Sequence, residues 1–318
     1  MNEAFLVSIL AVTIRAGTSL LYATIGEIFT ERSGILNLGV EGIMIMGAVM
    51  GFAAAYHSGS VWIGVVAAMA VGGFLALIHA FLTISLQADQ VVSGLVLTLF
   101  GTGMANFLGQ KLGPDGSPLV GLIGPKFLRE PIPVLSDLPF VGGSFFNQDL
   151  LVYCIYLLVP VAWFFLYRTR PGLHLRAVGE NPYTADAMGV NVLNVRYFYT
   201  VLGGMLIGLG GAHLSLSYTP GWTEGLTAGR GWIAVALVIF AAWDPVRAVI
   251  GAILFGGINA IQFRLQAAGT TIPASFLGMM PYVFTIVVLV AITWWESFSR
   301  RVGAPAALGQ PFVREQRS

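Results

Sequence analysis

The chain has 318 residues, of which 56% are apolar and only 10% are charged, and its mean hydropathy is +0.81. A soluble domain is about 25% charged, which would be about 80 residues in a chain of this length. This chain has only 16 basic and 15 acidic residues. The composition therefore excludes a water-soluble globule, and the high hydrophobicity excludes a disordered chain. It predicts an all-α polytopic membrane protein, because a helix satisfies its own backbone hydrogen bonds in lipid.

Nine segments are predicted to be transmembrane helices, within a range of eight to ten. A membrane-spanning helix needs about 20 mostly apolar residues. In chain order the segments are 4–23, 35–55, 61–83, 91–109, 151–167, 197–217, 231–243, 246–264 and 276–296. The segment 231–243 is short, and 246–264 contains Asn259 and Gln262. Short or polar segments are usual where helices line a transport pathway. The 40 glycines favour a closely packed bundle.

The orientation follows from the distribution of Lys and Arg, because cytoplasmic connections carry an excess of these residues. With nine spans, ten arginines lie in or beside the connections on one face of the membrane, and five basic residues lie on the other. The ten are Arg32, Arg168, Arg170, Arg176, Arg196, Arg247, Arg300, Arg301, Arg314 and Arg317, and the five are Lys111, Lys126, Arg129, Arg230 and Arg264. This bias predicts an N-terminus outside and a C-terminus in the cytoplasm.

Two segments break the pattern of apolar spans. Residues 110–149 contain six prolines, which remove backbone donors and prevent a regular spanning helix. We expect an external loop there, with a short hairpin or a lid. Residues 300–318 are polar and contain prolines, so we expect a flexible cytoplasmic tail following a membrane domain of residues 1–299.

Sequence motifs for catalysis, metal binding and nucleotide binding are missing. No HExxH motif occurs, and the four histidines have no ligand spacing. The single cysteine, Cys154, excludes a CxxC site, and neither lysine belongs to a phosphate-binding loop. The net charge of +1 and the absence of a basic run argue against a nucleic-acid partner. We therefore expect a non-enzymatic chain with no cofactor, and membrane lipid among its partners.

The predicted cytoplasmic connection 168–196 contains signals for a short helix. Asn181 suits the N-cap, Pro182 suits the first helical position, and Gly189 suits the residue after the last turn. A helix of about two turns is not stable alone in water, so it needs a surface to lie against. Spacing alone leaves two alternatives, which are docking into a cleft on a partner protein and resting on lipid headgroups.

Four stretches of sequence occur in one order along the chain. They are Gly26–Gly42, Ala88–Gly94, Arg176–Val190 and Gly229–Leu237, the last continuing to Trp243, Pro245 and Gly251. Together they resemble the permease subunits of bacterial ABC importers, in the branched-chain amino acid/ribose permease superfamily. Within it, the likeness is to the simple-sugar and nucleoside branch. The resemblance covers about residues 20–265, and it does not single out the solute.

The resemblance implies a division of labour between several proteins. Two permease subunits form the pathway, a separate ABC ATPase works from the cytoplasm, and an extracytoplasmic solute-binding protein delivers a nucleoside or simple sugar. The second permease is expected to be a paralogue, and the assembly belongs in the bacterial plasma (inner) membrane. Helix 181–189 would be the coupling helix, and the residues implied to contact the ATPase are Gly179, Glu180, Asn181, Pro182, Tyr183, Ala185, Met188 and Gly189.

Charges within predicted spans are costly and usually face a bundle interior or a cavity. Glu41 and Arg15 are the two placed in this way. Glu41 either lies near the pathway, paired with Arg15 or a partner subunit, or it begins a helix near Asn37, where an acid favours the helix dipole. In the second case residues 24–40 are partly re-entrant. A proton- or sodium-coupled secondary transporter of a small polar solute, using Glu41 and Arg15, is the alternative function. A membrane scaffold without a transport role is a further alternative function.

Uncharged polar residues in the spans are weaker candidates for contact with a solute. Thr98, Thr102 and Asn106 share one helix face at spacings of four residues. That face either meets a polar solute or hydrogen bonds to a neighbouring helix. The full set of candidate pathway residues is Asn37, Glu41, Gln90, Ser93, Thr98, Thr102, Asn106 and Asn259.

Overall fold

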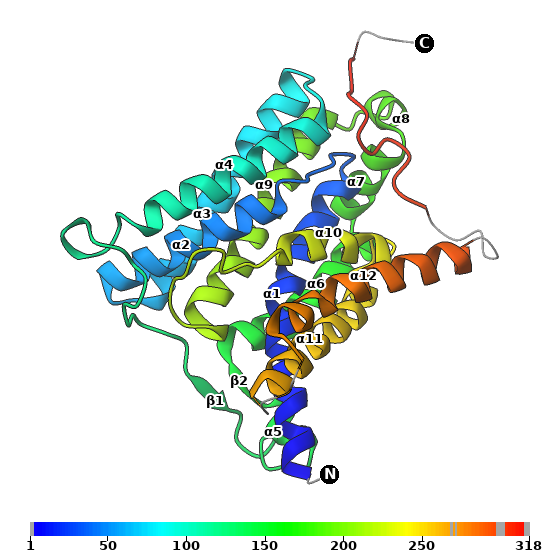
Figure 1. The fold of residues 1–318 in the computed structure, drawn as a ribbon. Helices are drawn as coiled ribbons and strands as arrows, with labels where there is room; N and C mark the ends of the chain where they lie inside the picture. Colours follow the sequence, from blue (N-terminus) through cyan, green and yellow to red (C-terminus); the bar gives the residue numbers. More distant parts are fainter. Residues whose placement is uncertain (1–2, 268–269, 271, 297–302, 315–318) are drawn as a thin grey trace.

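The computed structural model describes residues 3–267, 270, 272–296 and 303–314, and these residues form a helical bundle (Figure 1). The long helices are α1 Glu3–Arg32, α2 Val40–Ser58, α3 Val61–Ala80, α4 Gln90–Gly109, α6 Leu150–Arg168, α9 Val192–His213, α11 Pro245–Ala267 and α12 Ala274–Glu296. The shorter ones are α5 Val141–Phe145, α7 Arg170–Glu180, α8 Pro182–Ala187 and α10 Arg230–Phe240. Two π-helical turns, η1 Phe81–Ser85 and η3 Leu214–Tyr218, extend α3 and α9, and η2 Pro114–Gly116 is a 3₁₀ turn.

Within the described residues, seven helices are long and apolar enough to cross a membrane. They are α1, α2, α3 with η1, α4, α6, α9 with η3, and α11, and they correspond to seven of the nine predicted segments. The segment 231–243 forms α10, which has only 11 residues, and 276–296 lies within α12. A multi-pass membrane protein is therefore confirmed, while the count of nine spans stays a prediction.

The first helix is longer than the predicted span 4–23. It continues to Arg32, and only residues 33–39 are non-helical before α2 begins at Val40. We call residues 33–39 the α1–α2 connection. The re-entrant arrangement of 24–40 considered above is therefore wrong for residues 24–32, because the helical hydrogen-bond ladder runs through them without a break.

Helices α1, α2, α3 and α9 make the centre of the bundle (Figure 1). Glycines allow their backbones to approach closely. A Cβ atom at Gly47 of α2 would lie only 2.5 Å from the carbonyl oxygen of Gly208 in α9. Such contacts replace the hydrophobic effect as the force between helices in lipid, because lipid tails are as apolar as the side chains.

Residues 129–149, the later part of the segment 110–149, lie beside the beginning of α1, as Figure 1 shows. Strands β1 Arg129–Pro131 and β2 Asn147–Asp149 pair antiparallel, with Glu130 opposite Gln148. The Gln148 side chain donates to the carbonyl of Ala11 in α1 at 3.4 Å. The segment therefore contains a short β-ribbon and no long helix, and it lies at the end of the bundle away from α7 and α8.

Candidate functional site

The short helix α8 forms because its ends are specified locally. The Asn181 side chain accepts a hydrogen bond from the backbone N–H of Thr184 at 3.0 Å, and Pro182 is the first helical residue. Gly189 adopts φ +85°, which terminates the segment in a left-handed conformation. These are the roles that the sequence predicted for Asn181, Pro182 and Gly189. The helix has six residues, one turn shorter than the predicted 181–189.

Two faces of α7 and α8 differ in exposure. Gly179, Pro182 and Ala185 are buried against the chain itself, with Ala185 in an apolar cluster that includes Val192. The remaining members of the predicted set point outward, and Met188 is 80% exposed. These outward residues are Glu180, Asn181, Tyr183, Met188 and Gly189. An exposed methionine at a helix end is an adaptable apolar contact for a partner surface.

Residues 303–314, which we call the C-terminal strap, run along α7, α8 and α9 (Figure 1). A flexible tail was expected here, but the strap makes backbone hydrogen bonds from Ala307 to Gly179 at 2.9 Å and from Gly309 to Gly34 at 3.2 Å. Phe312 is 6% exposed and lies 5.2 Å from the ring of Tyr183.

Charged side chains add three further contacts between the strap and the helices, the first being the Glu180 carboxylate of α7, which accepts from the Ala306 N–H at 3.3 Å. Arg314 forms an ion pair with Asp186 of α8 at 3.3 Å. Arg196 of α9 donates to the carbonyl of Gln310 at 3.1 Å. The strap thus joins α7, α8, α9 and the α1–α2 connection into one unit.

The α1–α2 connection is held by polar side chains that the sequence assigned to a pathway. The Gln90 side chain accepts from the Leu36 N–H at 2.7 Å, and Thr98 donates to the Leu38 carbonyl at 2.9 Å. His79 lies 3.1 Å from the Leu36 carbonyl and 2.9 Å from the Ser93 hydroxyl. Since a carbonyl only accepts, His79 donates through Nε2 and accepts from Ser93 through Nδ1. Gln90, Ser93 and Thr98 therefore bind backbone and histidine of the same chain.

The inner side of the connection contacts a pair of acids on α1. Asn37 donates to Glu27 through its backbone N–H at 3.2 Å and through Nδ2 at 3.4 Å. Glu31, one turn further on, accepts from the indole N–H of Trp243 at 2.5 Å. Asn37 is fully buried. It is thus a structural link between α1 and the connection.

Thr102 and Asn106 continue the polar face of α4 beyond Thr98. Both are half-buried. The Oδ1 atom of Asn106 is buried and has no hydrogen-bond partner within the described part of the chain. The structure thus brings Gln90, Ser93 and Thr98 together at the connection and leaves Thr102 and Asn106 apart from it.

Glu41 lies in the first turn of α2 and binds the beginning of α10. Its carboxylate accepts from the Thr227 hydroxyl at 2.5 Å, from the Gly229 N–H at 3.0 Å and from the Gly231 N–H at 2.6 Å. The N-terminus of a helix carries partial positive charge and free N–H groups, so a carboxylate is well placed there. Glu41 forms no ion pair with Arg15 among the described residues, and its carboxylate contacts the start of α10 instead.

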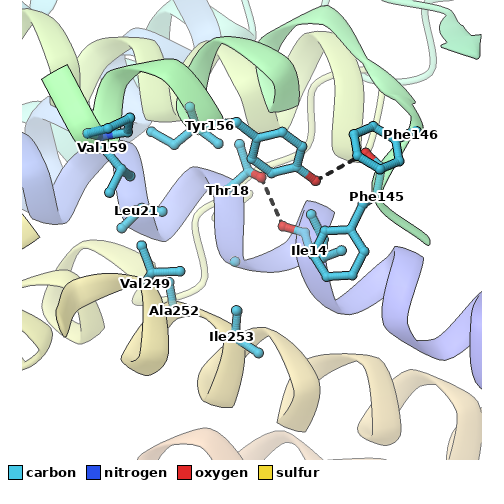
Figure 2. A pocket seen from close by; sticks show the side chains of 13 residues that line it. Ile14, Thr18, Leu21, Phe145, Phe146, Tyr156, Val159, Val249, Ala252 and Ile253 are labelled. Atoms are coloured by element: carbon cyan, nitrogen blue, oxygen red, sulfur yellow. Dashed lines mark hydrogen bonds between the residues drawn. The ribbon is translucent and has the colours of Figure 1, made fainter. Parts of the chain in front are cut away.

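Of the cavities between the helices, two differ in polarity. The first, shown in Figure 2, has a volume of about 320 Å³ and lies between α1, α6 and α11 under Phe145 and Phe146. Its Thr18 hydroxyl donates to the Ile14 carbonyl and the Tyr156 hydroxyl to Phe145, so its lining is almost wholly apolar. Such a lining suits lipid or another helix rather than a polar solute.

The second cavity, which we call the polar cavity, has a volume of about 330 Å³. It lies where η3, the start of α10, α11 and α12 meet, and it includes Asn259 of the candidate pathway residues. Its polar lining residues are Tyr218, Thr219, Arg230, Asn259, Gln262 and Tyr282. Tyr218, Thr219 and Tyr282 were not among the predicted site residues, because only the fold brings them next to Asn259.

Residues 8–295 match a known protein family, described as "branched-chain amino acid transport system / permease component". The chain belongs to this permease family. The resemblance stated from the sequence motifs is thereby confirmed. Permeases of this kind are transport components and not enzymes, and this one is a multi-pass membrane protein.

Curated relatives cover nearly the whole permease. It is 42% identical to a putative glucose ABC transporter permease protein of Haloferax volcanii, over 98% of this chain and 99% of that one. It is 36% identical to a nucleoside ABC transporter permease protein of Lactococcus lactis, over 94% of each chain. It is 33% identical to a guanosine ABC transporter permease protein of Bacillus subtilis, over 97% of each chain. The permease is therefore similar over nearly its whole length to permease proteins of ABC transporters.

One solved structure supports the fold. It is an inward-facing conformation of a putative metal-chelate type ABC transporter, with a TM-score of 0.50 and 14% sequence identity. The similarity covers 89% of the permease and 85% of that chain. At this identity the likeness concerns the fold alone.

Proposed function

We propose that the permease forms part of the translocation pathway of an ATP-driven importer for a neutral, hydroxyl-bearing solute, either a nucleoside or a simple sugar. The observation that carries the proposal is the relatives' similarity over the full chain, since those relatives bear glucose, nucleoside and guanosine names. The site is consistent with a neutral solute. The N-terminus of α10 would suit an anion, but the chain's own Glu41 already fills it.

The proposed topology places the N-terminus outside and the C-terminus in the cytoplasm, with nine spans. Two features support it. Residues 129–149 lie near the start of α1, whereas α7, α8 and the C-terminal strap lie at the other end of the bundle (Figure 1). The cytoplasmic end then carries most of the arginines, as the positive-inside rule requires.

In this proposal α8 receives the movement of an ABC ATPase. Tyr183 and Met188, at 44% and 80% exposure, supply the apolar contact, and Glu180, Asn181 and Gly189 border it. Displacement of α8 moves α9 directly, because Ala185 packs with Val192. It also moves the α1–α2 connection, because the strap joins α8 to Gly34. The helices around the pathway would tilt together as a consequence.

We further propose that the permease pairs with a paralogue and receives solute from an extracytoplasmic binding protein. The curated proteins of two organisms support the pairing. Bacillus subtilis has two different guanosine ABC transporter permease proteins, which are 33% and 24% identical to this chain. Haloferax volcanii likewise has two glucose ABC transporter permease proteins, one of them putative, at 42% and 24% identity.

The test is reconstitution in proteoliposomes with the second permease, the ATPase and the binding protein. The substitution Met188→Asp places a charge on the proposed contact without removing a buried group. We expect it to reduce ATP-driven uptake at least tenfold. The control, Ile123→Asp, changes a residue that is 95% exposed at the other end of the bundle, and it should leave uptake unchanged.

Two results would contradict the proposal. If the Met188→Asp variant takes up solute at the wild-type rate, α8 is not the contact with the ATPase. Uptake that continues without the ATPase, and that a protonophore abolishes, would favour the ion-coupled alternative. The bonding of Glu41 to the start of α10 argues against that alternative, because a carboxylate held by three donors is poorly placed to bind and release a cation.

A further inference from the structure

The polar cavity lies among membrane helices, where polar side chains are unfavourable unless they meet water, a solute or a partner. Its volume of about 330 Å³ is at the lower end of the range for small-molecule sites. Four separate segments line the cavity. They are η3, the beginning of α10, and parts of α11 and α12. The cavity is thus a concave polar site formed only in the folded chain.

Arg230 is the one residue with a formal charge among the described residues that line the cavity, and its guanidinium already makes contacts within the protein. It donates to the Ala16 carbonyl at 3.1 Å and to the Ser19 hydroxyl at 3.4 Å, both on α1. Its central carbon lies 5.1 Å from the centre of the Tyr218 ring, a cation–π contact. Arg230 is also buried, at 7% exposure. An anionic ligand would therefore compete with these contacts, and a neutral ligand would not.

Three polar groups of the cavity have already donated a hydrogen to the protein. Asn259 donates through Nδ2 to the Phe255 carbonyl at 3.0 Å. The Thr219 hydroxyl donates to the Leu214 carbonyl at 3.2 Å, and the Tyr282 hydroxyl to the Ala228 carbonyl at 2.7 Å.

Each of these groups retains an oxygen atom with free lone pairs. The three oxygens are Asn259 Oδ1, Thr219 Oγ1 and Tyr282 Oη. Asn259 also keeps a second N–H, and Gln262 adds an amide, so the cavity offers acceptor oxygens together with amide donors.

We propose that the polar cavity binds the hydroxyl groups of the solute during its passage, with the ring of a sugar as the recognised part. A neutral ligand with several hydroxyls, each both a donor and an acceptor, matches these oxygens and amide groups, because each hydroxyl then replaces a bond to water. A free hexose and the ribose of a nucleoside share this chemistry. The inference rests on the proposed function and names the residues that recognise its solute.

The experiment measures equilibrium binding of radiolabelled guanosine and glucose to the transporter complex in nanodiscs, without the binding protein. The variants are Asn259→Leu and Thr219→Val, and Thr219 is exposed, so its change does not threaten folding. We expect each variant to weaken binding of the preferred solute about five- to tenfold, as for one lost hydrogen bond. The control, Ile261→Val, lies on the same helix but lines an apolar cavity, and it should bind as the wild type does.

Solutes without hydroxyls test the recognised part. If ribose is recognised, guanine and 2′,3′-dideoxyguanosine should bind at least tenfold more weakly than guanosine. If the free sugar is recognised, glucose should bind and guanosine should not. Equal binding of guanosine and the dideoxy compound, unchanged binding by both variants, or no binding of either solute to the wild type would each overturn the proposal.

ATP-driven uptake by the wild type distinguishes a failure of the cavity assignment from a failure of the proposed function. If the wild-type complex imports guanosine or glucose but the cavity variants bind normally, only the cavity assignment fails. If the wild-type complex imports neither solute, the proposed function fails whatever the binding data show.

Discussion

The bond between Glu41 and the start of α10 is the contact whose loss we expect to be most costly. Its carboxylate accepts three hydrogen bonds, from Thr227, Gly229 and Gly231, at 2.5 to 3.0 Å. Glu41 is 9% exposed, and Thr227 is fully buried. Removing the carboxylate leaves these donors without water to replace it, so their desolvation is not compensated.

The magnitude follows from the number of bonds. A hydrogen bond to a charged group contributes about 1.5–3 kcal/mol. Glu41→Leu removes all three, for a loss of roughly 4.5–9 kcal/mol, which is comparable with the whole stability of a typical protein. Glu41→Gln keeps one oxygen and turns an amide N–H₂ toward a backbone N–H, so we expect a loss of about 1.5–3 kcal/mol.

The assay is thermal unfolding of the purified permease in detergent, followed by uptake measurements. Glu41→Gln should lower the midpoint by several degrees, and Glu41→Leu should prevent recovery of folded protein. Glu224→Gln is the matched control, because Glu224 is exposed in the neighbouring loop and accepts one bond from Gln110 at 2.9 Å. A Glu41→Gln protein that unfolds within 1 °C of the wild type would refute the assignment of Glu41 as the cap of α10.

Two further predictions concern packing. Phe312→Ala should release the C-terminal strap, since truncating a buried Phe costs about 3–5 kcal/mol, and hydrogen exchange of residues 303–314 should rise while Pro311→Ala leaves it unchanged. If exchange of the strap is equally slow in both variants, Phe312 does not hold it. Gly47→Ala should lower the yield of folded protein, because the new methyl would lie 2.5 Å from the Gly208 carbonyl, whereas Gly103→Ala has open space around it and should be tolerated. Equal yields of folded protein from the two glycine variants would contradict the close packing of α2 on α9.

Local signals predicted the ends of α8 well. Asn181, Pro182 and Gly189 act on neighbours within a few residues, and the caps of α8 are as expected. The positions of the long apolar helices could also be predicted, because a stretch of about 20 apolar residues is easily recognised in a sequence. The shortness of α10 was also visible before the fold was known.

Contacts between distant residues could not be predicted in the same way. Thr98 shares a helix face with Thr102 and Asn106, and this spacing is typical of a pathway as well as of a helix contact. In the fold, Thr98 donates to the carbonyl of Leu38, 60 residues away. Nothing in the spacing of α4 shows that a non-helical connection lies against it. Likewise, the polar composition of the tail gave no sign that Phe312 would be buried.

Glu41 shows how a choice left open by the sequence can have an answer that neither alternative contained. The acid does begin α2, as one alternative proposed, but its carboxylate serves a different helix, 186 residues away at Thr227. A half-length helix buried in a membrane needs an acceptor for its first N–H groups, because lipid supplies none. In carriers of anions the substrate fills that role. Here the protein's own Glu41 fills that role at α10, so this helix start is not free to bind a carboxylate or phosphate on a solute, which agrees with the neutral solute proposed above.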